Sequence, residues 1–333
     1  MKEAYRLTRK DGAPGIDGVT AADYEAKLEA NLLDLLERIR SGRYRAPPVR
    51  RTYIPKVDGS LRPHHLRSFL DQRVTDGVIR KMIDKWLKAG TVQDGVLRRT
   101  TEGSPQGGVI SPCLSNVFLH HVLDEWFESE VRPRLRGDCT LVRFADDAVM
   151  AFDNLVDAQR VLAVLGKRLA RFGLTLHPDK TRLVDFRPLM TESTRHPKAD
   201  GTSFDFLGLT HAWGRSRKRK PMVRQVTAKR RYARALAAVS DWCRKNRHRP
   251  ILDQHRRLSS MMRGHFAYYG VGGNMRRLQW FAHQVVRIWQ KWLSRRDRRS
   301  AVRWTRLNEI LRQHPLPRAR IAHPYVTASQ PLP

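Results

Sequence analysis

The sequence predicts an α+β protein in which short strands and helices are followed by a helical, strongly basic part. Three observations predict this fold class. Turn-rich stretches and alternating apolar segments are spread over residues 1–210. From about residue 226 to residue 312 the apolar residues recur at helical spacing. The hydrophobic fraction of 41% is high enough for a packed core and is not typical of a disordered chain.

The charge of the chain is large and unevenly distributed. Lysine and arginine number 64 against 32 acidic residues, which gives a net charge of +32. Residues 211–333 contain 30 of the cations and 4 of the acids, so most of the excess lies there. Such a chain repels itself unless a polyanion neutralises it. A basic surface can serve solubility alone, but at this magnitude we favour nucleic acid as the partner.

Cysteine content and hydropathy indicate the compartment. The three cysteines are far apart and form neither a disulfide framework nor a zinc signature. The N-terminus is polar, and no apolar stretch approaches the ~18 residues that a membrane span needs. We therefore expect a soluble cytoplasmic protein without a membrane partner, and the sequence leaves its oligomeric state open.

The elements of the front part follow from caps, turns and periodicity. Thr20 and Asp23 have the spacing of a capping box, which predicts a helix from there to Ile39 that ends at Gly42. The alternation over 49–54 predicts a strand, with a hairpin turn at Asp58-Gly59. Further predictions are one helix over 66–88 ended by Gly90, an irregular stretch over 91–108 and an apolar helix over 109–131.

The remaining elements are predicted in the same way. Residues 139–152 read as two strands joined at Asp146-Asp147, and a helix over 157–172 is closed by Gly173. Short strands are expected at 174–177, 182–186 and 204–210. Helices are expected at 227–246, 250–269, 274–294 and 303–312. The tail from His314 contains five prolines and either wraps the surface or is loose.

The segment Leu141–Phe152 places two adjacent acids, Asp146 and Asp147, between two apolar strands. Successive residues on a strand point to opposite faces, so a turn is where both carboxylates can face one cleft. Hard ions such as Mg²⁺ prefer carboxylate and phosphate oxygens, and two such ions can hold the attacking and leaving oxygens of phosphoryl transfer. Aspartate is also common in hairpin turns, so the dipeptide alone favours an ordinary turn.

A second motif changes this interpretation. Residues 101–119 read TEGSPQGGVISPCLSNVFL and lie about 30 residues upstream of the acidic pair. Paired glycines allow a close backbone approach to a ligand, and Gln106 offers a donor and an acceptor to a base or sugar. The combination of this motif with the acidic hairpin resembles the reverse transcriptases of group II introns. The resemblance implies that Asp146 and Asp147 are the catalytic, Mg²⁺-binding residues and that Gln106 and Gly107 bind nucleotide.

Other segments resemble the same family in the same order. Residues 12–20 resemble its N-terminal finger motif, and residues 53–63 resemble the strand pair whose Lys56 and Arg62 would hold the incoming triphosphate. Residues 173–181 resemble a palm motif that places Lys180 near the nucleotide. Residues 204–209 resemble the strand that grips the primer end, here with Phe206, Leu207 and Gly208. Each of the three cations could also be an ordinary exposed side chain.

The basic part resembles the thumb, or maturase, region of these proteins, most clearly over 259–270. The resemblance implies contact with intron RNA, because cations neutralise phosphates and release counterions. The residues expected at the RNA or primer are Arg215, Arg217, Lys218, Arg219, Lys220, Lys229, Arg230, Arg231 and Arg263. For the segment 215–220 a solvated loop is the alternative, and we favour RNA contact.

Six of the eight tryptophans also lie in residues 211–333. Aromatic rings among cations can stack on unpaired bases. They can equally well fill a helical core, and for Trp242, Trp280, Trp289 and Trp292 we favour the core.

The family pattern implies four divisions of this chain. The pattern is interrupted in one place, after Pro63. The divisions are a fingers remnant over 1–63, an incomplete palm over 64–210, a basic helical thumb or maturase domain over 211–313 and a proline-containing tail over 314–333. After Pro63 the chain runs directly into the helical segment 64–70. A second finger motif and the first palm strand, which bears a third metal-binding aspartate in the family, are both missing. Asp71, Asp76 and Asp84 fall in a helical pattern, so we do not expect them to replace it.

By resemblance the protein is an RNA-directed DNA polymerase with a maturase role, a magnesium-dependent nucleotidyltransferase of a mobile group II intron. Its implied partners are intron RNA, a DNA target or primer, and deoxynucleoside triphosphates. The missing acid lowers the negative charge that attracts Mg²⁺, so we expect polymerase activity to be lost. The alternative function is a catalytically defective RNA-binding maturase remnant, and a third possibility is a decayed product without a stable fold.

Overall fold

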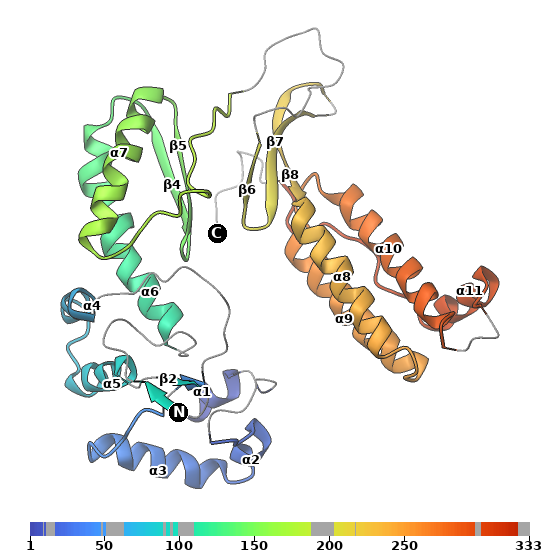
Figure 1. The fold of residues 1–333 in the computed structure, drawn as a ribbon, viewed down its shortest axis with the longest axis horizontal. Coiled ribbons are helices and arrows are strands. Elements are labelled where there is room, and N and C mark those ends of the chain that lie inside the picture. Colours follow the sequence, from blue (N-terminus) through green and yellow to red (C-terminus); the bar gives the residue numbers. More distant parts are fainter. Residues whose placement is uncertain are drawn as a thin grey trace. The chain divides into compact units, whose positions relative to one another are not determined.

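The structure is a computed structural model of the 333-residue chain, and it describes most of the chain. The described residues are 1–8, 10, 17–47, 49–50, 63–88, 91–93, 96–98, 110–187, 203–216, 218–296 and 301–325. The chain forms two compact units, Met1–Leu183 and Val184–Pro333, drawn in Figure 1. The functional divisions predicted at residues 63, 210 and 313 stay predictions.

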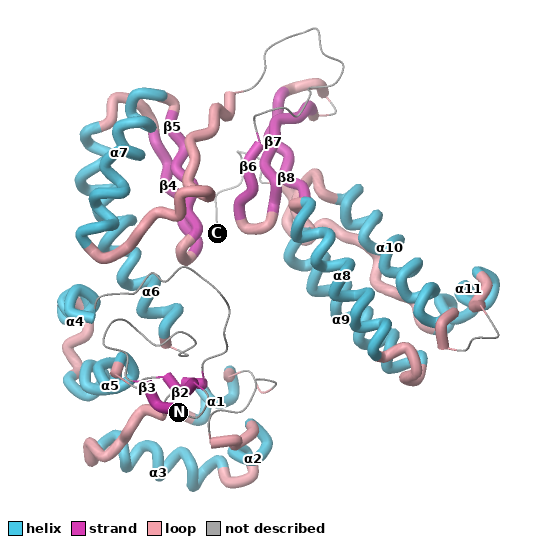
Figure 2. Tube along the Cα trace, in the orientation of Figure 1, coloured by secondary structure: helices cyan, strands magenta, loops and turns pink. Residues whose placement is uncertain are grey.

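The first unit is mainly helical in its described part (Figure 2). Thr20 and Asp23 form the predicted capping box, because each side chain accepts a hydrogen bond from the other residue's backbone N–H. The helices of this unit are α1 (Lys2–Leu7), α2 (Ala21–Glu25), α3 (Leu28–Arg40), α4 (Pro63–Asp71), α5 (Gly77–Leu87), α6 (Ser111–Leu119) and α7 (Leu155–Arg171).

Two predictions for the segment after residue 62 are wrong. The single helix expected over 66–88 is divided into α4 and α5, because the Asp76 side chain accepts hydrogen bonds from the backbone N–H groups of Val78 and Ile79 and begins a new helix. The stretch expected to be irregular contains β2 (Thr91–Gln93) and β3 (Val96–Arg98), which pair antiparallel. The two-residue strand β1 (Val49–Arg50) pairs parallel to β2. The predicted turns at Asp58-Gly59 and Gly90 lie outside the described residues.

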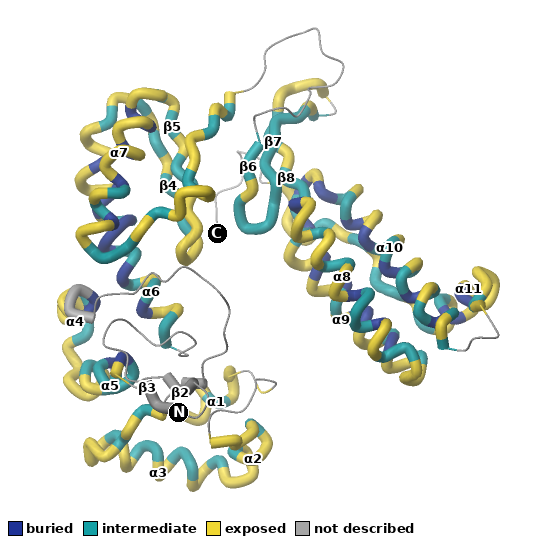
Figure 3. The backbone as a smooth tube through the Cα atoms, in the orientation of Figure 1, coloured by how far each residue is buried: buried dark blue, intermediate teal, exposed yellow. Residues whose placement is uncertain are grey.

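The apolar helix predicted over 109–131 is present in an irregular form. After α6 the chain continues helically through the π-helical segments η1 (His120–Asp124) and η2 (Phe127–Val131) and the 3₁₀ turn η3 (Arg132–Arg134). The buried side chains of this long helix pack with α4, α5 and α7 to form the core of the unit. Figure 3 marks the buried residues along these elements in dark blue. Its most buried members include Leu66, Phe118, Val122, Phe127 and Val161.

A hairpin packs beside this core. Strands β4 (Cys139–Phe144) and β5 (Asp147–Phe152) pair antiparallel as predicted, and in the described part of the chain they form a two-stranded sheet. Cys139 and Leu141 face the core, whereas Val142 and Phe144 on the other face are 52% and 65% exposed. Residues 174–177 and 182–186, predicted as strands, are irregular, and among the described residues no strand pairs with them.

The second unit begins with a three-stranded antiparallel sheet of β6 (Ser203–Phe206), β7 (Leu209–Arg215) and β8 (Pro221–Thr227). The single strand predicted over 204–210 is therefore two strands joined by a tight turn. The helices that follow agree with the predictions to within a few residues: α8 (Lys229–Lys245), α9 (Ile251–Tyr269), α10 (Met275–Leu293) and α11 (Trp304–Gln313).

These four helices enclose a second core, and the tail lies against it. Phe266, Phe281 and Trp289 are almost completely buried there. Leu316 and Ile321 of the tail pack against this core, and the His323 backbone N–H donates to the Gly270 carbonyl at 2.7 Å. The tail thus wraps the surface as far as residue 325. The predicted α+β class, with small antiparallel sheets followed by C-terminal helices, is confirmed.

Candidate catalytic turn and nucleic-acid interface

The predicted catalytic pair lies at the tip of the β4–β5 hairpin. Phe144 pairs with Asp147, so Ala145 and Asp146 form a two-residue loop, and both carboxylates are exposed. Ala145 has φ of 53°, in the left-handed region that favours glycine. Hairpin loops of two residues favour a positive φ at this position, which explains the conformation and its local strain.

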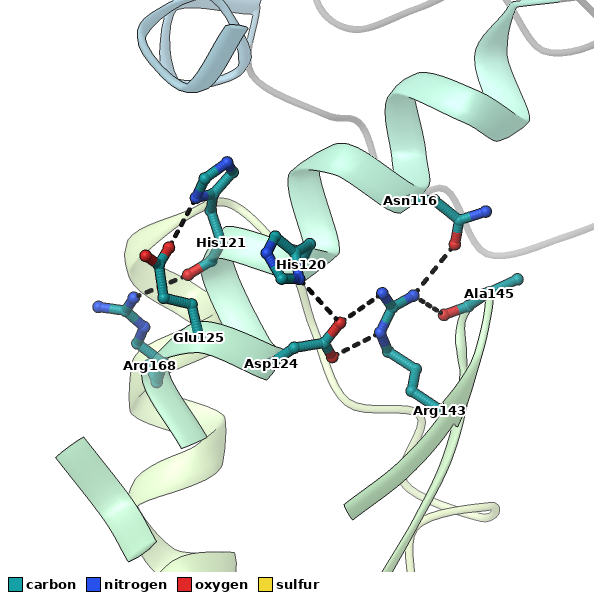
Figure 4. A network of polar contacts seen from close by, with 8 residues as sticks. All are labelled: Asn116, His120, His121, Asp124, Glu125, Arg143, Ala145 and Arg168. Atoms are coloured by element: carbon teal, nitrogen blue, oxygen red, sulfur yellow. Dashed lines mark hydrogen bonds and ion pairs between the residues drawn. The ribbon is translucent and has the colours of Figure 1, made fainter. Parts of the chain in front are cut away.

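Arg143 anchors this tip to the long helix, as Figure 4 shows. Its Nε and Nη2 atoms donate to the two carboxylate oxygens of Asp124 at 2.7 and 2.6 Å. Its Nη1 atom donates to the Ala145 carbonyl at 2.8 Å and to the Asn116 side-chain oxygen at 3.1 Å. The Arg143 side chain is 12% exposed, and the bond to Asp124 raises its pKa above the ordinary arginine value. One guanidinium therefore fixes the turn on which Asp146 is presented.

The helix side of this network is supported by further polar contacts (Figure 4). Nδ1 of His120 lies 3.5 Å from the Asp124 carboxylate, and Nδ1 of His121 lies 2.6 Å from that of Glu125. The hydrogen bond with His121 lowers the pKa of Glu125. Arg168 of α7 donates from Nε to the Val122 carbonyl at 3.1 Å, a backbone group within the π-helical turn. The wide turns of this helix are thus supported from both sides.

The donor set at the turn falls short of a complete metal centre. Exposed carboxylate oxygens are the correct ligand type for Mg²⁺, which binds through one or two carboxylates together with substrate phosphates. Holding two ions for phosphoryl transfer requires more ligands. Across the described ranges, no group of three or more His, Cys, Asp or Glu side chains could hold a metal. Asp146 and Asp147 therefore fit part of such a site.

The sequence predicted that the three acids after Pro63 would not act as metal ligands beside Asp146 and Asp147. In the structure each of them has another role. Asp71 forms an ion pair with Arg80 at 2.5 Å, and Asp84 lies 3.4 Å from Arg67. Asp76 caps α5 through both of its hydrogen bonds. All three carboxylates contribute to the local structure of α4 and α5.

The other predicted nucleotide-binding residues are only partly described. Lys180 is exposed in a turn where its backbone N–H donates to the His177 carbonyl at 3.2 Å. Lys180 does not lie in a strand. Lys56, Arg62, Gln106, Gly107 and the RNA-binding candidate Arg217 lie outside the described residues.

In the second unit, the predicted primer-gripping residues form the β6–β7 turn. Phe206 pairs with Leu209, and the loop residues Leu207 and Gly208 have φ of 49° and 78°. Such a turn requires positive φ at both positions, which a leucine rarely adopts. The Tyr268 hydroxyl at the end of α9 donates to the Leu207 carbonyl at 3.0 Å. The Ala228 backbone N–H donates to the Gly208 carbonyl at 3.0 Å, so the strained turn is held on two sides.

The predicted RNA-binding cations form two groups at opposite ends of the β7–β8 hairpin. Arg215, Lys218, Arg219 and Lys220 are exposed at its turn, where Arg215 pairs with Pro221. Lys229, Arg230 and Arg231 are exposed in the first turn of α8, beside the Gly208 turn. Seven-residue strands separate the two groups by about 20 Å at ~3.4 Å per residue. Arg263 is exposed on α9.

The first turn of α8 is electrostatically unusual. The N-terminus of a helix has a partial positive charge and favours acidic side chains. Here it contains three cations and no acid, and the Ala228 cap supplies no side-chain acceptor. The arrangement lowers helix stability, and an external anion bound near this helix end would offset the loss.

The tryptophans have different environments. Trp289 is completely buried, and its Nε1 donates to the Gln254 side-chain oxygen at 2.9 Å. Trp242 and Trp292 are half-buried against the same core, so core packing is confirmed for these three. Trp280 is 51% exposed, and the core assignment is wrong for it. It lies on the solvent side of α10, where its ring is available to a ligand.

Several contacting residues were not predicted as site residues. Arg143 and Asp124 have no sequence signal, because they are 19 positions apart and meet only through tertiary packing. Tyr268 falls within the maturase-like segment 259–270, which could have drawn attention to it. The buried Asn274 joins sheet and helices by donating to the Thr227 hydroxyl at 2.8 Å.

Comparisons with known proteins find similarity over the part of the chain that contains the acidic turn. Residues 54–211 match the family model of reverse transcriptase (RNA-dependent DNA polymerase). Protein YkfC of Escherichia coli K12 is 28% identical over 217 residues, covering 41% of this chain and 57% of that protein. The group II intron-encoded protein LtrA of Lactococcus lactis is 35% identical over 57 residues, 17% of this chain and 10% of LtrA. A 91 kDa protein in a cob intron of Schizosaccharomyces pombe is 35% identical over 68 residues, 20% of this chain and 8% of that protein.

The chain thus spans less than two thirds of the curated relatives it matches. The family match includes the acidic hairpin, the upstream motif and the β6–β7 turn. Family members use a divalent metal with nucleic acid and nucleotide substrates. In the described part of the chain, no helix is long and apolar enough to cross a membrane. Residues 54–211, somewhat less than half of the chain, are thus similar to the reverse transcriptase family of RNA-dependent DNA polymerases.

Proposed function

We propose that this protein binds RNA through its basic second unit and acts as a maturase-like partner of group II intron RNA. One observation carries the proposal: three exposed cations, Lys229, Arg230 and Arg231, occupy the N-terminal turn of α8 without an acidic residue. Their placement costs helix stability, and a phosphate backbone restores that stability by neutralising them. The likeness to the intron-encoded LtrA supports intron RNA as the particular partner.

RNA-directed DNA synthesis is the second candidate function, and the intact Asp146-Asp147 turn favours it. Its substrates would be a primer or DNA target and deoxynucleoside triphosphates, with Mg²⁺ held in part by the two carboxylates. Two observations count against efficient synthesis. The described residues supply no third ligand to the pair. The alignment with YkfC extends over 217 positions but includes only 41% of this 333-residue chain. A sizeable internal stretch of YkfC therefore has no counterpart in this chain.

A salt titration of RNA binding tests the first proposal. The full chain would be titrated with a group II intron RNA and with an unrelated RNA of equal length. We expect log K to fall steeply and linearly with log salt, and the intron RNA to bind more tightly. Replacing Lys229, Arg230 and Arg231 by glutamine should reduce the slope by about 2–3, at roughly 0.7–0.9 per phosphate contact.

A matched control uses cations that already have acidic partners. Arg244 and Lys245 lie at the other end of α8 and form ion pairs with Asp241. Replacing both by glutamine should change the slope by less than the first-turn variant does. A flat salt dependence of the unmodified chain contradicts RNA binding by these cations. Equal affinity for both RNAs contradicts the intron-specific part of the proposal.

A further inference from the structure

The solvent face of α10 has a composition that core packing does not explain. Five exposed residues, spaced by three or four positions, form one line along the helix: Arg276, Trp280, His283, Arg287 and Lys291. Residues at this spacing lie on one face of a helix. We call this line the α10 stripe. It extends about 22 Å at ~1.5 Å per residue, and α10 contains no acidic residue.

The arginines of the stripe have no polar partners among the described residues, whereas Lys291 lies over the Trp292 ring at 5.4 Å. Arg277, the neighbour of Arg276, lies over the Tyr232 ring at 5.4 Å. Neither Arg276 nor Arg287 forms a hydrogen bond or ion pair with any residue that the structure describes. Arg276 also lies in the first turn of the helix, where a cation is electrostatically unfavourable. Its position is explained if a negatively charged ligand lies over it.

The stripe includes an aromatic ring that the fold leaves available. The Trp280 side chain is 51% exposed, and its ring meets that of His283 edge-on, with centroids 6.0 Å apart and planes at 89°. This contact restrains the indole without covering both of its faces. A half-exposed tryptophan between two arginines matches the sites at which proteins stack unpaired bases and neutralise the adjoining phosphates.

Other ligands fit these observations less well. The opposite face of α10 is buried, with Leu278, Phe281, Val285 and Trp289 at 0–1% exposure, so the helix has no free apolar face to insert into a membrane surface. Another copy of this chain has the same positive charge and would be repelled. A regular duplex keeps its bases stacked and offers no free base face to Trp280.

We propose that the α10 stripe binds an unpaired segment of RNA, with a base stacked on Trp280 and phosphates neutralised by Arg276 and Arg287. This inference rests on the proposed RNA-binding function and adds the site and the kind of RNA. It concerns a different surface from the first turn of α8.

Fluorescence anisotropy of the full chain with two labelled RNAs tests the proposal. One RNA is an unstructured oligouridylate, and the other is a hairpin duplex with the same number of phosphates. We expect Trp280→Ala to weaken oligouridylate binding about tenfold and hairpin binding much less, whereas Trp280→Phe retains most of the affinity. The combined Arg276→Gln and Arg287→Gln change should reduce the salt slope for oligouridylate by about 1.4, or ~0.7 per phosphate.

The matched control is Trp304→Ala. Trp304 on α11 is 49% exposed, so it has the same accessibility outside the stripe, and its removal should leave oligouridylate binding unchanged. If Trp280→Ala and the unmodified chain bind oligouridylate with the same affinity, the α10 stripe is not an RNA-binding site, while the proposed function remains intact. Equal losses for hairpin and oligouridylate would overturn the preference for unpaired RNA. A poly-glutamate peptide that competes as well as oligouridylate would assign the stripe to an acidic protein. Failure of the unmodified chain to bind any RNA would overturn both proposals.

Discussion

The guanidinium of Arg143 and the carboxylate of Asp124 form a two-pronged ion pair, with N–O distances of 2.7 and 2.6 Å. The remaining Arg143 nitrogen reaches the Ala145 carbonyl in the acidic turn. A part-buried pair of this geometry is stronger than a surface ion pair, because it is less screened by water and its two hydrogen bonds are parallel. It explains how a hairpin in a two-stranded sheet keeps a defined tip.

Replacing Arg143 by lysine should loosen this tip. Lysine keeps the charge but cannot donate in parallel to both Asp124 oxygens and to Ala145. We expect the free energy of unfolding of the first unit to fall by about 1–3 kcal/mol, and the amides of 139–152 to exchange faster. Urea denaturation with hydrogen exchange measures both. The control Arg38→Lys alters an exposed pair with Asp34 and should cost less than about 1 kcal/mol. Equal effects of the two changes would show that the Arg143 pair has no special role.

Two glycines should respond in opposite ways to alanine. Gly208 has φ of 78°, and a Cβ there would lie 3.0 Å from the Tyr269 hydroxyl, so Gly208→Ala should destabilise the second unit by about 1 kcal/mol or more. Gly264 lies inside α9 with nothing within 4 Å of an added Cβ, so Gly264→Ala should stabilise it by roughly 0.5–1 kcal/mol. Thermal unfolding compares the two variants. A stabilising Gly208→Ala would show that the turn is not strained.

His265 should make the second unit sensitive to acid. Its ring stacks on Phe281 with centroids 3.7 Å apart, and its Nε2 is buried without a hydrogen-bond partner in the described structure. Burial lowers the pKa of His265 from 6.5 to about 4. Between these values the unfolded chain binds a proton that the folded chain excludes, so stability is complete above pH 6.5 and falls toward pH 4. The expected loss is at most roughly 3.4 kcal/mol, at ~1.36 kcal/mol per pKa unit.

Urea denaturation at pH 7 and pH 5 measures this effect. The change His265→Phe keeps an aromatic ring and should reduce the difference in stability between the two pH values. The exposed His248 provides the control, since His248→Ala should leave that difference unchanged. If His265→Phe and the unmodified chain lose the same stability on acidification, other groups are responsible.

Local patterns predicted most of the elements correctly. The capping box at Thr20, the β4–β5 hairpin and the four basic helices each depend on residues close in sequence, so their signals are visible there. The helix break at Asp76 also had a local signal, an aspartate before Gly77, but the apolar periodicity on both sides obscured it. The predicted strands at 174–177 and 182–186 failed because a strand requires a neighbour, which alternation alone does not guarantee.

Contacts between residues far apart in the sequence were harder to predict. The pairing of Arg143 with Asp124 depends on how the hairpin packs against the helix, which no periodicity encodes. The place of each tryptophan in the helical repeat could have distinguished the buried rings from the exposed one. Trp289 shares a face with Phe281 and Val285, whereas Trp280 falls among the cations on the opposite face.

A single reaction tests the central claim most directly. The purified chain would be incubated with an RNA template, an annealed primer, Mg²⁺ and deoxynucleoside triphosphates, and both bound RNA and primer length would be measured. We predict salt-sensitive RNA binding without primer extension, and the same result for the variant Asp146→Asn. Extension by the unmodified chain that disappears in Asp146→Asn would contradict the account, because it would show that Asp146 and Asp147 belong to a working polymerase centre.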